Sequence, residues 1–178
     1  MSSSATGGYI SPSGVVLYDQ QLEDIFQAFI VGVSGLPSDM VRPRWQKVPP
    51  PMPDVGVDWV AFAVKVVKPE NSPAFMQDTD STTAIRHEEL DLFFSFYGDN
   101  GQSFANILKD GLAIPQNIAQ LRTQKIKYVE CGEITSAPDF LNNQYVHRYD
   151  LVATFRRQTE RTYEVLTFTS ASSINIHT

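Results

Sequence analysis

Three side chains in the last third of the sequence are of the types that build a nucleophilic catalytic site: Cys131, His147 and Asp150. A thiolate, an imidazole base and an orienting carboxylate are recognised by their arrangement in space, so their order along the chain excludes nothing. Cys131, however, lies in a strand pattern between Glu130 and Glu133, and neighbouring carboxylates raise the pKa of a thiol. We therefore interpret Cys131 as a structural cysteine, with a small cysteine hydrolase as the less favoured alternative.

Metal and phosphate sites have no support in the residue spacing. The three histidines, His87, His147 and His177, lie far apart, and a single cysteine cannot form a thiolate zinc cluster. The segment "YGDNGQS" at residues 97–103 has two glycines at a predicted strand-to-helix turn but lacks both the G-x-G-x-x-G pattern and the lysine of a P-loop. The sequence predicts no metal and no cofactor.

Three carboxylates, Glu88, Glu89 and Asp91, lie close together in a predicted strand. Glu89 and Asp91 share a strand face about 7 Å apart, a separation that glycoside chemistry can use. Acids on an exposed strand face more commonly form cross-strand ion pairs, for which Arg148 and Arg156 are candidates. The sequence therefore predicts no catalytic residue.

Composition indicates one globular domain. The chain has 178 residues, a net charge of −6 and one cysteine, so no intrachain disulfide can form. Its longest apolar run, residues 57–67, is interrupted by Asp58 and Lys65 and is shorter than the roughly 20 residues of a membrane span. We expect a flexible tail at residues 1–10, a single domain at 11–178, no signal peptide, no membrane contact and intracellular synthesis. The scattered Arg and Lys do not predict a groove that holds DNA.

Hydrophobic periodicity predicts the elements that must position these side chains. Leu22, Ile25, Phe26, Phe29, Ile30 and Val33 recur at helical spacing, in a helix at 19–33 that Asp19 caps and Gly35 and Pro37 end. A proline-rich connector at 40–54 is predicted to be stiff and extended.

Strands and further helices follow the connector. We expect a central strand at 56–67, with Val60, Phe62, Val64 and Val66 on one side, and then a loop or arm at about 68–84 with an apolar tip. A strand at 85–97 leads into a helix capped by Asp99 or Asn100, and a second helix starts at Pro115. The remaining expected elements are a strand at 125–134, a loop or single helical turn at 136–143, a strand at 144–158 and a closing edge strand at 163–176. This order predicts an α+β fold, a single domain with a mostly antiparallel sheet and helices packed on one face.

The sequence also resembles a known family. The segments "VRPRWQKVPPPMP", "DWVAFAV", "HEELDLFFSFYGDNGQSFANILKDGL" and "QYVHRYDLVATFRRQ" are similar, over about residues 20–170, to the neck or tail-terminator (tail completion) proteins of tailed bacteriophages. This resemblance implies a structural virion protein without enzymatic activity, assembled in the host cytoplasm and found in the tail or neck. It further implies a ring, usually of six copies, that ends the tail tube, binds the tail tube protein and the head-tail connector or adaptor, and lets genomic DNA pass through its lumen.

In that family context, two groups of residues become candidate contacts. A head-to-tail ring needs two different complementary patches, and we assign subunit or partner contacts to Pro49, Pro50, Pro51, Met52, Pro53, Phe75 and Met76. Arg148, Arg156 and Arg157 are predicted to face the lumen or the tube. The alternative is another head-tail joining or head-completion ring protein, which its position in the virion would distinguish.

Overall fold

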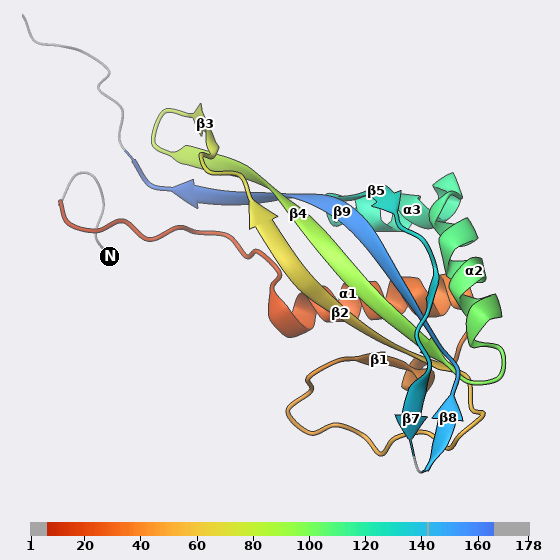
Figure 1. The fold of residues 1–178 in the computed structure, drawn as a ribbon. Coiled ribbons are helices and arrows are strands. Elements are labelled where there is room, and N and C mark those ends of the chain that lie inside the picture. Colours follow the sequence, from red (N-terminus) through yellow and green to blue (C-terminus); the bar gives the residue numbers. More distant parts are fainter. Residues whose placement is uncertain (1–6, 142, 166–178) are drawn as a thin grey trace, which may run out of the picture. The chain divides into compact units, whose positions relative to one another are not determined.

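The computed structural model describes residues 7–141 and 143–165, whose helices and strands are drawn in Figure 1. The helices are α1 (Asp19–Ser34), the 3-10 turn η1 (Ser38–Met40), α2 (Gly101–Leu112) and α3 (Pro115–Arg122). The strands are β1 (Val41–Pro43), β2 (Trp59–Pro69), β3 (Ala74–Gln77), β4 (Thr82–Tyr97), β5 (Ile126–Cys131), β6 (Thr135–Ser136), β7 (Asp139–Leu141), β8 (Gln144–Val146) and β9 (Arg148–Tyr163).

Packing of the backbone divides these residues into two units, which are described separately. Among the described residues, unit 1 contains 7–16, 70–86 and 159–165, and unit 2 contains 17–69, 87–141 and 143–158. β4 and β9 each contribute residues to both units.

Unit 2 holds the hydrophobic core between its helices and one face of its sheet. The strand order is β1-β2-β4-β9-β5, and only β1 pairs in parallel. Pairing of Val60 with Phe96 and of Phe62 with Phe94 brings together four buried side chains of the core cluster. Helix α1 lies against one face of this sheet (Figure 1). The predicted α+β class, with its mostly antiparallel sheet, is confirmed.

The apolar stripe of α1 is buried as its helical spacing predicts. Leu22, Phe26, Phe29 and Ile30 are buried in the core. Gly35 ends the helix in the left-handed conformation, with φ 74°, as expected of a helix C-terminus. The predicted N-cap is wrong, because Asp19 is the first helical residue and the cap position is Tyr18.

A β-bulge in β2 changes the predicted pattern of this strand. Val64 pairs with Leu92, but the next pair is Val66 with Asp91, so Lys65 is an extra residue between them. The expectation of one unbroken alternation along this strand is wrong, because an inserted residue shifts the register of those that follow. The predicted side of the Val66 side chain lies outside what the structure describes.

The turn between β4 and α2 is closed by a residue from the start of β2. Asn100 is the N-cap of α2 but makes no side-chain cap bond, contrary to prediction. Instead the Asp58 carboxylate accepts from the Asn100 backbone N–H at 2.7 Å and from its side-chain amide at 2.9 Å. Gly98 has φ 101°, and a Cβ there would lie 2.5 Å from the Val57 carbonyl oxygen, so only glycine fits.

Unit 1 contains the predicted arm, which is a β-hairpin. β3 pairs antiparallel with the first residues of β4, Ala74 with Ile85 and Gln77 with Thr82. We call residues 70–85 the arm. On the far side of the unit, Ser13 forms a bridge with Thr162 of β9. No described residue of unit 1 belongs to the hydrophobic core cluster.

The C-terminal third differs from prediction in three places. The expected loop or helical turn at 136–143 contains β7, which forms a hairpin with β8. The strand expected at 144–158 is divided into β8 and β9, and β9 continues to Tyr163. Most of the closing strand expected at 163–176 lies outside the described residues.

Candidate subunit-contact surfaces

The arm exposes large apolar side chains. All four residues of β3 are exposed, with Phe75 at 65% and Met76 at 63% of their full accessible surface. The arm also carries three acids, Glu70, Asp78 and Asp80, and no Lys or Arg. An apolar surface with a single sign of charge is typical of a contact with a partner rather than of a solvated loop.

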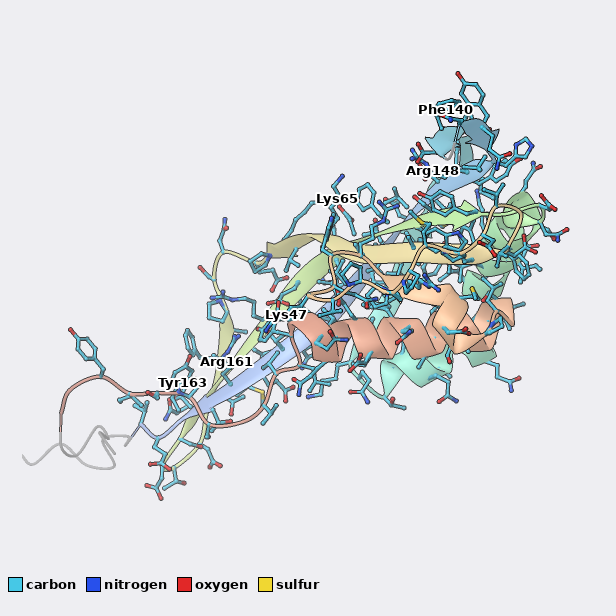
Figure 2. The ribbon with its side chains drawn as sticks, turned by 90° about the horizontal axis from the view of Figure 1, so that it is seen from below. Lys47, Lys65, Phe140, Arg148, Arg161 and Tyr163 are labelled. Carbon is cyan, nitrogen blue, oxygen red and sulfur yellow. The ribbon has the colours of Figure 1, made fainter. Side chains whose placement is uncertain are left out.

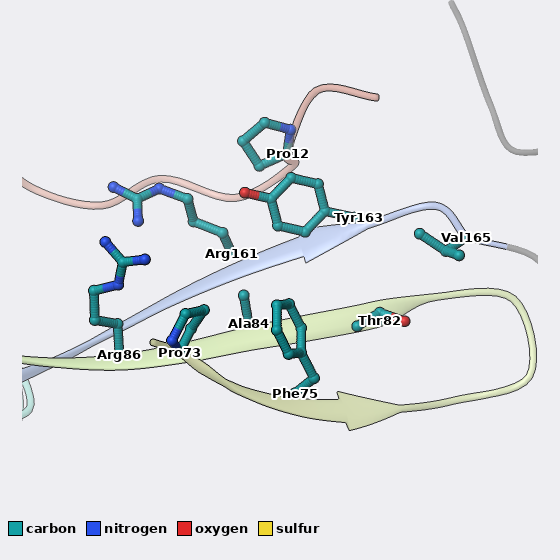
Figure 3. A pocket seen from close by; sticks show the side chains of 9 residues that line it. All are labelled: Pro12, Pro73, Phe75, Thr82, Ala84, Arg86, Arg161, Tyr163 and Val165. Atoms are coloured by element: carbon teal, nitrogen blue, oxygen red, sulfur yellow. The ribbon is translucent and has the colours of Figure 1, made fainter. Parts of the chain in front are cut away.

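A groove lies on one face of unit 1. It measures about 690 Å³ and is lined by Pro12, Pro73, Phe75, Thr82, Ala84, Arg86, Arg161, Tyr163 and Val165. Figure 3 shows Arg86 and Arg161 toward one end and the rings of Phe75 and Tyr163 beyond them. The Thr159 hydroxyl donates to the Arg86 carbonyl at 3.3 Å and so joins the two strands that form its floor.

The second surface is the sheet face of unit 2 that the helices leave uncovered, where polar side chains form a network. Arg148 donates to Asp139 and to Asp150, each at 3.0 Å. Ser95 donates to the second oxygen of Asp150 and accepts from Arg44. The network ties the ends of β4 and β9 to the segment that follows β1.

This network forms one wall of a hollow of about 330 Å³, which we call the cationic hollow. Its lining residues are Arg44, Trp45, Ala63, Lys65, Phe93, Phe94, Ser95, Arg148, Asp150 and Val152. The Lys65 ammonium lies 4.5 Å from the centroid of the Phe93 ring. Lys65 and Arg148 project on the side of the sheet opposite α1 (Figure 2). Three cations and one carboxylate thus line the hollow.

The proline-rich connector passes from this hollow to β2. Pro49, Pro50, Pro51 and Met52 are exposed and Pro53 is half-buried. Arg42 holds the connector by donating to the Pro51 carbonyl at 2.6 Å. The assignment of these residues to a subunit contact stays a prediction.

A further exposed aromatic pair lies on the β7–β8 hairpin, which sequence analysis missed. The rings of Phe140 and Tyr145 pack at a centroid distance of 5.0 Å, and Tyr145 is 78% exposed. The sequence has two adjacent asparagines at positions 142 and 143, and this dipeptide was the available sequence signal for a hairpin.

The three arginines predicted to face a lumen or tube occupy different environments. Arg156 is exposed, and Arg148 is half-buried in the network. Arg157 is 4% exposed, because β9 alternates and places it on the helix-facing side after buried Phe155. It therefore presents no surface to a lumen.

Arg157 instead makes a buried ion pair. Its Nε donates to Glu88 at 2.7 Å, and one terminal nitrogen donates to the Leu17 carbonyl at 2.6 Å. The guanidinium also lies 4.7 Å from the Tyr18 ring centroid. These contacts join three segments of unit 2. Along the sequence, each contacting residue lies within two residues of the boundary with unit 1.

The catalytic set considered from the sequence is not assembled. Cys131 pairs with Ala153 in the ladder, and His147 lies six residues before Ala153, about 20 Å along the strand. Asp150 is engaged by Arg148 and Ser95. Burial raises the pKa of the Cys131 thiol, with nearby Lys109 acting in the opposite direction, so the thiol is a poor nucleophile at neutral pH.

The neighbouring carboxylates form ion pairs, and one partner is a lysine that the sequence analysis did not name. Lys68 bonds to Glu89 at 3.0 Å and to Asp91 at 3.1 Å, and these bonds raise the pKa of the lysine. Within the described residues, no group of three or more metal-ligating side chains is positioned to hold a metal ion. Nor does any described helix have the length and apolar character needed to cross a membrane.

A comparison with known families identifies one match. The model of a family described as phage neck terminator protein matches residues 20–178. No curated protein matches the chain.

Proposed function

The chain belongs to the phage neck terminator family, and from this premise we propose that it forms a closed ring at the head-proximal end of a phage tail. The ring, of six copies as the sequence resemblance implies, ends the tail tube and joins the tail to the head-side connector or adaptor. The match over residues 20–178 is the observation that carries this proposal.

The surfaces of the monomer support self-association. A ring built head to tail needs two different patches on each copy. Unit 1 offers the arm with exposed Phe75 and Met76, and unit 2 offers the uncovered sheet face, Trp45 and the connector. A small sheet without its own core, such as that of unit 1, commonly depends on a partner for stability.

The charge of the chain suits a lumen through which DNA moves. A net charge of −6 disfavours tight binding to phosphates, because affinity for nucleic acid rises with the number of phosphates that Lys and Arg neutralise. Arg156 is the exposed arginine of the predicted lumen group, and Arg148 is already held by Asp139 and Asp150. Reversing the charge at Arg156 therefore tests a lumen or tube contact at an exposed position.

The proposed role is structural and involves no catalysis. The family is one of neck components of the virion, and in this chain Cys131, His147 and Asp150 stand apart from one another. Replacing Cys131 by Ser should leave phage yield unchanged, whereas a fall in yield with the fold intact would point to thiol chemistry.

A phage that lacks this protein provides the direct test. If the protein ends the tube, infected cells should accumulate tails of irregular, extended length that do not join heads, and supplying the protein should restore normal particles. Tails of normal length already joined to heads would contradict the proposal. Gold-labelled antibody should mark the head-proximal end of the tail, whereas label within the head connector would favour a head-completion protein.

A further inference from the structure

We propose that the arm of one copy docks into the cationic hollow of a second copy, with Asp80 paired with Lys65. This inference rests on the proposed ring and names the two surfaces that form its repeating contact.

The hollow has an excess of positive charge that the described residues do not neutralise. Arg44, Lys65 and Arg148 line it, whereas two carboxylates are engaged there: Asp150 accepts from Arg148 and Ser95, and Asp139, outside the lining, accepts from Arg148. The Nε atoms of Arg44 and Arg148 are buried and have no hydrogen-bond partner among the described residues. Because burial of an unpaired polar or charged group is unfavourable, an incoming carboxylate would be bound strongly there.

Lys65 is placed on the hollow side by the alternation of β2, because it follows Ala63, which also lines the hollow, by two residues. It is also the extra residue between the pairs of Val64 and Val66, so it has no direct partner in the register with β4. Its ammonium lies over the Phe93 ring and makes no ion pair with any described residue.

Trp45 forms an apolar margin of the hollow at a cost to the monomer. Its φ is 59°, in the left-handed region that bulky residues rarely adopt, and its side chain is 74% exposed. Such a conformation is unfavourable for a bulky residue and is characteristic of functional sites. A strained and exposed tryptophan is explained if a partner covers it.

The arm has the complementary character. Asp80 is exposed and has no recorded partner among the described residues, whereas the Asp78 carboxylate accepts from the Thr79 backbone N–H within the turn. Exposed Phe75 and Met76 lie on the same hairpin and match the rings of Trp45 and Phe93. One chain thus carries both halves of a heterologous contact, which is what closure into a ring requires.

A charge exchange tests the pairing. Lys65→Glu and Asp80→Lys should each weaken self-association about tenfold or more, measured by sedimentation, and the double variant should recover most of that loss. The control is Lys127→Glu, which makes the same charge change at an exposed position of β5 outside the hollow and should assemble normally. Far-UV circular dichroism confirms that each variant is folded. Additive losses in the double variant would overturn the pairing.

Disulfide trapping identifies the occupant of the hollow. In a Cys131→Ser background, mixing Met76→Cys with Trp45→Cys protein should give a covalent dimer. If a chain that carries both cysteines forms the disulfide only within itself, the hollow binds the arm of the same copy. Absence of any cross-link would overturn the docking. If a closed ring forms without cross-link or charge rescue, only this inference fails. If no ring forms with intact protein, the proposed function fails as well.

Discussion

The buried pair of Arg157 and Glu88 gives the sharpest test of the fold. Replacing Arg157 by Met removes the guanidinium but keeps an apolar side chain of similar length. Glu88, whose side chain is 7% exposed, then loses its cation, and the Leu17 carbonyl loses its donor. Breaking a buried pair in this way should cost about 3–5 kcal/mol of unfolding free energy.

This loss of unfolding free energy is larger than the loss expected when an exposed arginine is replaced. Arg156→Met changes the adjacent, exposed position and should alter stability by no more than about 1 kcal/mol, the upper end for an exposed ion pair. The double variant Glu88→Leu with Arg157→Met should be more stable than Arg157→Met alone, because it leaves no uncompensated charge.

Urea unfolding followed by fluorescence and circular dichroism measures these three variants, and Glu88→Leu alone, against the parent. A loss below about 1 kcal/mol for Arg157→Met, equal to that of an exposed pair, would refute the burial of Arg157. Strict additivity in the double variant would refute the coupling with Glu88.

Three further outcomes follow from local geometry and burial. Gly98→Ala should destabilise the protein in urea unfolding, because Gly98 has φ 101° and a Cβ there would lie 2.5 Å from the Val57 carbonyl oxygen. The control is Gly32→Ala, where no atom lies within 4 Å of the new Cβ, and it should be neutral or stabilising by up to about 1 kcal/mol. Gly111→Ala should destabilise because its Cβ would lie 2.1 Å from a Val33 methyl, and Val33→Ala should restore part of the loss; no restoration would place the strain elsewhere. Cys131 should react with iodoacetamide more slowly than a free cysteine at pH 8 and accelerate as pH rises, because burial raises the pKa of its thiol; a rate equal to that of the free amino acid would contradict its burial.

The sequence predicts elements whose signal is periodic and local. The stripe of α1 and the alternation of β4 each extend over enough residues to identify the element, and Pro115 and Gly35 mark helix ends through their own backbone preferences. β1 has three residues and pairs with β2 across the connector, so no local period could predict it.

Features that depend on distant partners were missed. The residue that closes the turn before α2 is Asp58, about 40 positions from Asn100 in sequence, and the bulge at Lys65 appears only in the register with β4. Arg157 is different, because the alternation that buries Phe155 already indicated that the second residue after it faces inward. Its grouping with Arg156 was an error that the pattern could have prevented.

The candidate contact surfaces were only partly visible in the sequence. Phe75 and Met76 are apolar residues in a polar segment, and this contrast predicted an exposed tip without its hairpin form. The hollow escaped prediction because its cations come from three separate segments, around Arg44, Lys65 and Arg148, that the sheet brings together.

The closed ring is the central claim, and native mass spectrometry of the purified protein over a range of concentrations tests it most directly. We expect a single oligomer of fixed copy number, with six subunits as the family resemblance implies, and no continuous ladder of larger species. A monomer at every concentration, or an open series of polymers without a preferred size, would contradict it.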